Sequence, residues 1–387
     1  MKISRNIALL GMVSLFTDLS SQMIYPLLPK LLTNLGAGMI LIGVIEGLAE
    51  ASASILKPFA GKLSDRYKKR LPFVFSGYGL SAIVKPLFAF AGTWLHVLLL
   101  RFGDRVGKAI RNPPRDVLIS LSSDHKNRGK SFGIHRAFDR VGSIGGPLLA
   151  LAVFYFYPED LSAVFLWAGI PAVLALVFIP FVRDQHELPK KTVHDAKPSS
   201  HQNIQFKYFL VANTIFTLGN SSNAFLILKA SEVGFEMYQL PMLWAVYNIF
   251  CAISSPVMGS LSDRVGRLPV IIASFGYYCV VYILFAFMAD FYLIWILFAL
   301  YGVYYGLSKG VFKAYIADIT IGEKRGWYYG VFEMWTGIAL LLASIMMGFL
   351  WDQFGSQVAF LVSATFSLVG LIIFILGQGG QRLFKWK

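Results

Sequence analysis

Apolar residues along this chain gather into twelve long runs that are separated by short polar segments. The runs cover residues 6–32, 39–60, 71–92, 94–118, 131–157, 161–182, 207–229, 238–258, 269–289, 291–319, 327–350 and 355–378. Runs of about 20 apolar residues without period-2 alternation indicate helices that cross a membrane. The pattern therefore predicts an all-α integral membrane protein with twelve transmembrane helices.

The longest polar interruption divides these runs into six and six. It predicts an N-terminal six-helix bundle over residues 1–182, a cytoplasmic linker over 183–206 and a C-terminal bundle over 207–387. The two halves also resemble each other, because EASASILKPFAGKLSDR (Glu50–Arg66) aligns without gaps with NIFCAISSPVMGSLSDR (Asn248–Arg264). Two parallel repeats of this kind predict a pseudo-symmetric pair of bundles.

Composition supports the membrane assignment, since 56% of the residues are hydrophobic and only 14% are charged. Soluble domains carry about a quarter charged residues. The net charge of +14 gathers in alternate short loops, the linker and the tail, which argues against a nucleic-acid partner. Lysine and arginine mark cytoplasmic loops, so both termini are predicted to be cytoplasmic in a cytoplasmic (inner) membrane. The basic start followed by an apolar run is interpreted as a retained first span.

The sequence offers little for covalent chemistry. Cys251 and Cys279 both lie within apolar runs, and their spacing fits neither a metal site nor a disulfide framework. No phosphate-binding Walker loop, nucleophile arrangement or metal cluster is apparent in the sequence. We therefore expect no enzyme activity, no cofactor and no bound metal.

Two loops at equivalent places of the halves carry a longer pattern, GKLSDRYKKR (Gly61–Arg70) and GSLSDRVGRLP (Gly259–Pro269). With the repeat, these loops resemble the major facilitator superfamily (MFS) over nearly the whole chain. The resemblance implies a secondary transporter that works by alternating access, and a cytoplasmic gating latch in which each loop acid lies against a helix N-terminus of the other half. The latch residues would be Gly61, Asp65, Arg66, Gly259, Asp263, Arg264 and Arg267. The alternative is that these loops only set the topology through their positive charge.

Charged residues also lie inside the apolar runs. The fourth run contains RFGDRVG and the fifth contains RAFDRVG, so both share the spacing R-x-x-D-R-V-G. Each charge would cost about 2.5–3.5 kcal/mol if it faced lipid. Most of these side chains must therefore face a cavity or one another. Pro113 and Pro114 are expected to break the fourth helix, which would leave Arg111 and Arg115 at the membrane interface.

The resemblance implies that the first, fourth, seventh and tenth helices line the cavity, with contributions from the second, fifth, eighth and eleventh. Arginine forks bind carboxylate and phosphate well, which predicts an anion-seeking site. The predicted substrate-binding residues are Arg101, Arg105, Lys108, Arg136, Arg140, Lys85, Asn220, Tyr247, Asn248 and Lys309. The acids that could carry protons are Asp18, Glu46, Glu50, Asp104, Asp139 and Glu333. The alternative is that the charges of the fourth and fifth helices pair only to hold these helices in register.

The sequence thus predicts a proton-coupled secondary active transporter for a small anionic or zwitterionic organic solute, either a carboxylate or a phosphate. The expected partners are this solute, the proton and the lipid bilayer, and the expected state is a monomer. The segments RFGDRVGKA and GSIGGPLLAL partly resemble antiporter signatures, which favours export, whereas the basic cavity equally suits uptake. A proton-driven multidrug exporter and a non-transporting receptor on the same fold are the alternatives.

Overall fold

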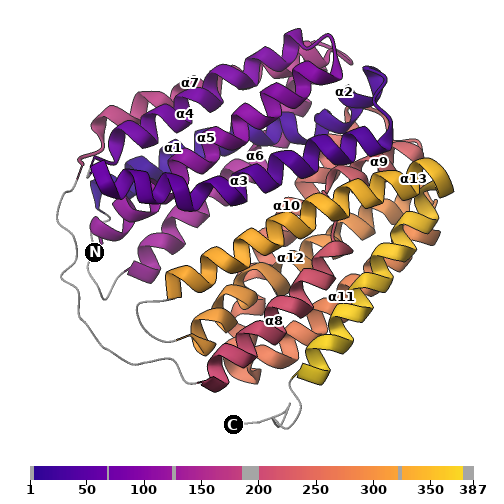
Figure 1. Cartoon of the computed structure of the whole chain (residues 1–387). Helices are drawn as coiled ribbons and strands as arrows, with labels where there is room; N and C mark the ends of the chain where they lie inside the picture. Colours follow the sequence, from indigo (N-terminus) through magenta and orange to yellow (C-terminus); the bar gives the residue numbers. More distant parts are fainter. Residues whose placement is uncertain (1–3, 68, 124–127, 185–199, 321–324, 378–387) are drawn as a thin grey trace. The chain divides into compact units, whose positions relative to one another are not determined.

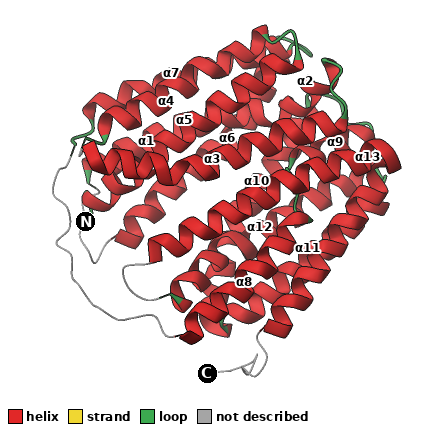
Figure 2. Cartoon of the chain, viewed as in Figure 1, coloured by secondary structure: helices red, strands yellow, loops and turns green. Residues whose placement is uncertain are grey.

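The computed structural model describes residues 4–67, 69–123, 128–184, 200–320 and 325–377. Helices and short connections make up these residues, and none of the described residues lies in a strand (Figure 2). The all-α membrane fold expected from the hydropathy pattern is confirmed.

The described residues of the first half of the chain contain seven α-helices (Figure 1). They are α1 (Arg5–Ile24), α2 (Leu28–Asn34), α3 (Met39–Tyr67), α4 (Leu71–Leu87), α5 (Trp94–Leu121), α6 (Arg128–Phe156) and α7 (Leu161–Phe178). The 3₁₀ turn Tyr25–Leu27 joins α1 to α2, so that these elements form one span. Asp160 caps α7 by accepting the backbone N–H of Ala163 at 3.0 Å.

The second half continues with α8 (Ser200–Leu218), α9 (Ala224–Glu232), α10 (Gln239–Val265), α11 (Arg267–Phe287), α12 (Phe291–Ile319) and α13 (Arg325–Gly377). Helix α13 contains two spans, because Gly355 has a φ of 84° and interrupts the helix. A positive φ is readily adopted by glycine, which has no β-carbon. The short loop expected around WDQFG is thus reduced to a kink at one glycine.

Nine helices in the described part of the chain are long and apolar enough to cross a membrane. Three further spans account for the predicted twelve. One is the second part of α13, one is α5, which carries many charges, and one is the pair α8 and α9, which a break divides. The structure is therefore consistent with twelve spans.

The chain divides into two compact units. The first contains Met1–Ala37, Leu48–Lys191 and Phe235–Ala245, and the second contains Gly38–Gly47, Thr192–Gly234 and Val246–Lys387. Each unit thus includes a short segment from the other half of the sequence, taken from α3 or α10. The bundle boundaries predicted from the linker stay a prediction.

Glycines set the closest helix approaches in the first unit, and two of them end the R-x-x-D-R-V-G segments. A β-carbon on Gly107 of α5 would lie 2.7 Å from the carbonyl oxygen of Gly77 on α4. A β-carbon on Gly142 of α6 would lie 2.6 Å from the carbonyl oxygen of Leu15 on α1. The third DRVG differs, because its Gly266 has a φ of 95° and precedes α11 as a turn residue.

Two expectations about individual helices are wrong. Helix α5 continues through Pro113 and Pro114 to Leu121. Membrane helices tolerate proline where neighbouring helices and side chains satisfy the freed backbone groups. Conversely, the run 207–229 is not one helix, because α8 ends at Leu218 and α9 begins at Ala224. The intervening Gly-Asn-Ser-Ser-Asn sequence consists of residues that favour turns over helix.

Candidate functional site

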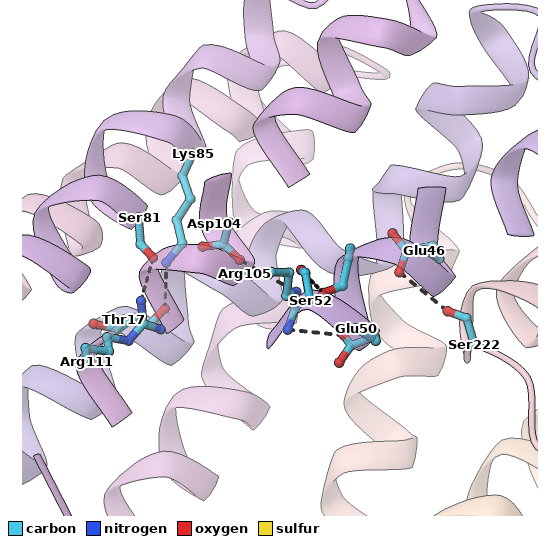
Figure 3. A network of polar contacts seen from close by, with 11 residues as sticks. Thr17, Glu46, Glu50, Ser52, Ser81, Lys85, Asp104, Arg105, Arg111 and Ser222 are labelled. Carbon is cyan, nitrogen blue, oxygen red and sulfur yellow. Dashed lines mark hydrogen bonds and ion pairs between the residues drawn. The ribbon is translucent and has the colours of Figure 1, made fainter. Parts of the chain in front are cut away.

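An ion cluster joins α3 to α5 in the first unit. The Arg105 guanidinium lies 3.2 Å from a carboxylate oxygen of Glu50 and 3.9 Å from one of Asp104 (Figure 3). Arg105 and Asp104 are both buried. Charges inside a membrane protein are retained when they pair or face a cavity, so this cluster accounts for three of the charges expected in the spans.

Lys85 and Arg111 are also buried and bonded. The Lys85 ammonium donates to the carbonyl oxygen of Thr17 at 3.1 Å, which ties α4 to α1 (Figure 3). Arg111 donates to the hydroxyl of Ser81, and its guanidinium lies 4.5 Å from the centre of the Tyr78 ring. Only 5% of Arg111 is exposed, so its guanidinium is held by these protein contacts, and the interfacial position expected for it stays a prediction.

Arg101 contacts an aromatic stack in the first unit. Its guanidinium lies 5.1 Å from the centre of the Tyr25 ring. Tyr25 packs on Trp244 with ring centres 4.9 Å apart, and Trp244 donates to the Gln22 side chain at 2.6 Å. Arg101 is 3% exposed, so this arrangement holds it away from solvent.

A cavity of about 160 Å³ lies among α1, α4, α5 and α6. Its lining residues are Ser14, Thr17, Asp18, Tyr78, Lys108, Arg111, Asn112, Arg115 and Asp139. Three of them, Asp18, Lys108 and Asp139, belong to the predicted site. The other six were missed, although the arginines and the asparagine continue the charged face of α5.

The cationic and acidic side chains of this cavity come from different helices. Lys108, Arg111 and Arg115 come from α5, whereas Asp18 comes from α1 and Asp139 from α6. Asp139 lies 3.5 Å from the buried imidazole of His135. Arg115 lies 2.9 Å from the carboxylate of Asp116.

Three atoms of the lining are buried and find no hydrogen-bond partner among the described residues: Nε of Arg111, Oδ1 of Asp139 and the hydroxyl oxygen of Tyr78. Buried polar groups in native proteins are almost always satisfied by protein, water or a ligand. The cavity thus offers both a donor and an acceptor for a polar occupant.

In the second unit, the predicted polar residues gather at the break between α8 and α9. Asn220 donates to the Tyr304 hydroxyl at 3.2 Å, and the Tyr301 hydroxyl donates to Asn223 at 2.7 Å. Tyr247 stacks on Tyr301 with ring centres 5.5 Å apart. The break is therefore held by neutral hydrogen bonds inside an aromatic surrounding.

The remaining predicted residues of the second unit have varied surroundings. Asn248 is buried, whereas Lys309 is exposed and lies 6.0 Å from the centre of the Tyr305 ring. Glu333 is ion-paired with Lys313 at 2.9 Å.

Glu46 also belongs to the second unit, although its helix α3 comes from the first half of the sequence. Its buried carboxylate accepts the Ser222 hydroxyl at 3.4 Å (Figure 3). Glu50, one turn further along the same helix, belongs to the first unit and pairs with Arg105.

Comparison with known proteins identifies the family. The sequence matches the Major Facilitator Superfamily over residues 10–218 and 208–379. The chain belongs to the major facilitator superfamily. This MFS transporter is 34% identical over 382 residues to an uncharacterized MFS-type transporter of Methanocaldococcus jannaschii. The alignment covers 97% of this chain and 96% of the relative.

Two further comparisons add a named relative and a fold. The MFS chain is 22% identical over 371 residues to the quinolone resistance protein NorA of Staphylococcus aureus, covering 94% of each chain. A solved POT family transporter in complex with 5-aminolevulinic acid superposes with a TM-score of 0.81 at 12% sequence identity, covering 96% of each chain. At this identity the structural likeness shows the fold alone.

The loop residues of the expected MFS latch have local partners. The Asp65 carboxylate lies 3.8 Å from the guanidinium of Arg70. Asp263 pairs with Arg267, which also lies 3.1 Å from Asp318. The other latch residues are partly or fully exposed: Gly61, Arg66, Gly259 and Arg264. The latch between the halves stays a prediction.

None of the four predicted substrate arginines lines the cavity, and Arg101 and Arg105 are buried in the contacts described above. Arg136 is exposed and Arg140 is partly exposed, both on α6. The assignment of all four to substrate binding in this MFS transporter stays a prediction.

Proposed function

We propose that this MFS transporter is proton-coupled and moves a small anionic or zwitterionic organic solute, a carboxylate or a phosphate, across the cytoplasmic membrane. It would work as a monomer with both termini in the cytoplasm. The observation that carries this proposal is the polar cavity of the first unit, whose α5 wall presents three cationic side chains. Drug-sized ligands occupy pockets of about 300–1,000 Å³. A cavity of about 160 Å³ therefore favours a small solute.

The roles follow from side-chain chemistry. Arg111 and Arg115 would bind the negative group of the solute, because guanidinium forks match carboxylate and phosphate oxygens, and Lys108 would add a point charge. Asp18 and Asp139 line the same cavity and would carry protons, as acids within membrane spans often do. Glu46, Glu50, Asp104 and Glu333 remain the other candidate proton carriers.

A multidrug exporter is the second candidate, and two observations favour it. One relative is named a quinolone resistance protein. In addition, the break between α8 and α9 has the aromatic neighbours Tyr247, Tyr301 and Tyr304, which suit flat apolar compounds.

A thermal-shift screen of the purified protein separates the two candidates. The panel contains carboxylates, phosphates and cationic drugs, measured on the wild type, Lys108→Ala and, as a control, Lys207→Ala, which changes an exposed lysine on α8. We expect anions to stabilise the wild type and the control but not Lys108→Ala. Stabilisation by cationic drugs alone would favour the exporter and overturn the proposal.

A further inference from the structure

We infer that the solute anion and protons bind together in the cavity of the first unit, so that transport is symport with protons and not exchange against them. This inference rests on the proposed anion-binding function and adds the sign of the coupling. It starts from the placement of charge. Lys108, Arg111 and Arg115 are spaced by three and four residues and share one face of α5, whereas the two acids come from α1 and α6.

The charge balance sets the direction of the coupling. With Asp18 and Asp139 ionised, three cationic side chains stand against two carboxylates in the lining. An incoming anion then competes with these carboxylates for the same cations. Protonation removes the competing charge and leaves Lys108 and Arg111 for the anion, while Arg115 is shared with Asp116. Because charges interact more strongly in a protein interior than in water, this change matters for affinity.

Linkage makes the effect reciprocal. If protons raise the affinity for the anion, the anion raises the affinity for protons by the same factor. An antiporter requires the opposite sign, in which substrate and proton displace each other. The cavity has cations for the solute on one helix and acids for the protons on two others, so both can be bound at once.

Two lining atoms without hydrogen-bond partners support binding of the anion and the protons at the same time. Nε of Arg111 is a buried donor and Oδ1 of Asp139 is a buried acceptor, and neither finds a partner among the described residues. Arg111 is already held by Ser81 and the Tyr78 ring, which fixes its guanidinium beside the cavity. An anion would satisfy the donor, and protonation would remove the charge from the acceptor's carboxyl group.

Further charged or titratable groups lie near the two acids. They are Lys85 and Tyr78 on α4, Lys108, Arg111, Arg115 and Asp116 on α5, and His135 and Arg136 on α6. Lys85 is bonded to the carbonyl oxygen of Thr17, the residue before Asp18, and His135 lies beside Asp139. Substitution of Asp18 therefore tests the acid that is not in contact with the imidazole.

The test is titration calorimetry of the purified full chain with sulfate and with succinate. Both probes are essentially fully ionised at pH 7, so any protons taken up on binding are bound by the protein. Repeating the titration in buffers of different ionisation enthalpy measures this uptake. We expect proton uptake on binding, with an affinity that rises by up to about tenfold per pH unit of acidification for each proton taken up. Asp18→Asn should bind the anion more tightly at pH 7 and take up fewer protons, while the control Glu236→Gln, which changes an exposed acid, behaves as the wild type.

Each outcome has a separate meaning. Anion binding with proton release, or with no proton exchange, overturns the symport inference and leaves the anion transporter standing. If neither sulfate nor succinate binds at any pH, both the symport inference and the proposed anion-binding function are overturned. Asp139→Asn provides a second variant, for which we expect the same loss of proton uptake if Asp18→Asn does not fold.

Discussion

The packing of the first unit can be tested at Gly142 on α6. An alanine β-carbon there would lie 2.6 Å from the carbonyl oxygen of Leu15 and 2.9 Å from the β-carbon of Asp18. These neighbours are the backbone and the first side-chain atom of α1, so they cannot move without moving the helix. We expect Gly142→Ala to push α1 and α6 apart.

The magnitude follows from overpacking, which costs about 1–3 kcal/mol in a well-packed core. Gly133 lies on the same helix, and a β-carbon there would meet nothing within 4 Å. Gly133→Ala should therefore stabilise the protein by about 0.5–1 kcal/mol, since alanine favours helix over glycine. The two alanine variants should differ by roughly 1.5–4 kcal/mol in the free energy of unfolding.

The assay is thermal unfolding of the purified variants in the same detergent. Gly142→Ala should melt below the wild type, and Gly133→Ala should melt at or above it. Anion binding should also weaken in Gly142→Ala, because the new methyl group lies against Asp18 in the cavity lining. If Gly142→Ala melts at or above Gly133→Ala, the close approach of α1 and α6 is refuted.

Two other predictions concern ion pairing and capping. Glu50→Ala removes the carboxylate 3.2 Å from the buried Arg105 and should lower stability by about 1–3 kcal/mol, less than for a fully buried pair because the Glu50 side chain is 32% exposed. A double-mutant cycle with Arg105→Gln measures the coupling, and additive effects would show that the pair does not interact. Asp290 caps α12 by accepting the backbone N–H groups of Tyr292 and Leu293 at 2.8 and 3.0 Å, so Asp290→Ala should cost about 0.5–2 kcal/mol. Asp290→Asn should keep most of that stability, and equal melting temperatures for all three proteins would contradict the cap.

The spans could be predicted from the sequence because lipid requires long apolar helices with internally satisfied backbones. Breaks within them were harder to predict. The Gly-Asn-Ser-Ser-Asn segment at 219–223 contains strong turn residues, yet the apolar flanks made the run 207–229 resemble one helix. Pro113 and Pro114 had the opposite effect, since a local breaking tendency was overridden by packing within α5.

The expectation that Pro113 and Pro114 break the helix also explains why part of the cavity lining was not predicted. The expected break at Pro113 left Arg111 and Arg115 out of the predicted site, whereas both line the cavity with Lys108 on the continuous helix. Helical periodicity correctly predicted a charged face on α5. It could not show which side chains on α1, α4 and α6 lie opposite that face, because such contacts depend on tertiary packing. Ser14, Thr17 and Tyr78 therefore had no distinguishing signal in the sequence.

Solute-driven proton flux in proteoliposomes tests the central claim most directly. A gradient of succinate or inorganic phosphate is imposed across vesicles that contain the wild type, Lys108→Ala or Lys207→Ala, and a dye trapped in the lumen reports the pH. The account predicts that an inward anion gradient carries protons inward with the wild type and Lys207→Ala, and that Lys108→Ala abolishes this flux. Proton movement that responds only to cationic drugs and is unchanged in Lys108→Ala would contradict it.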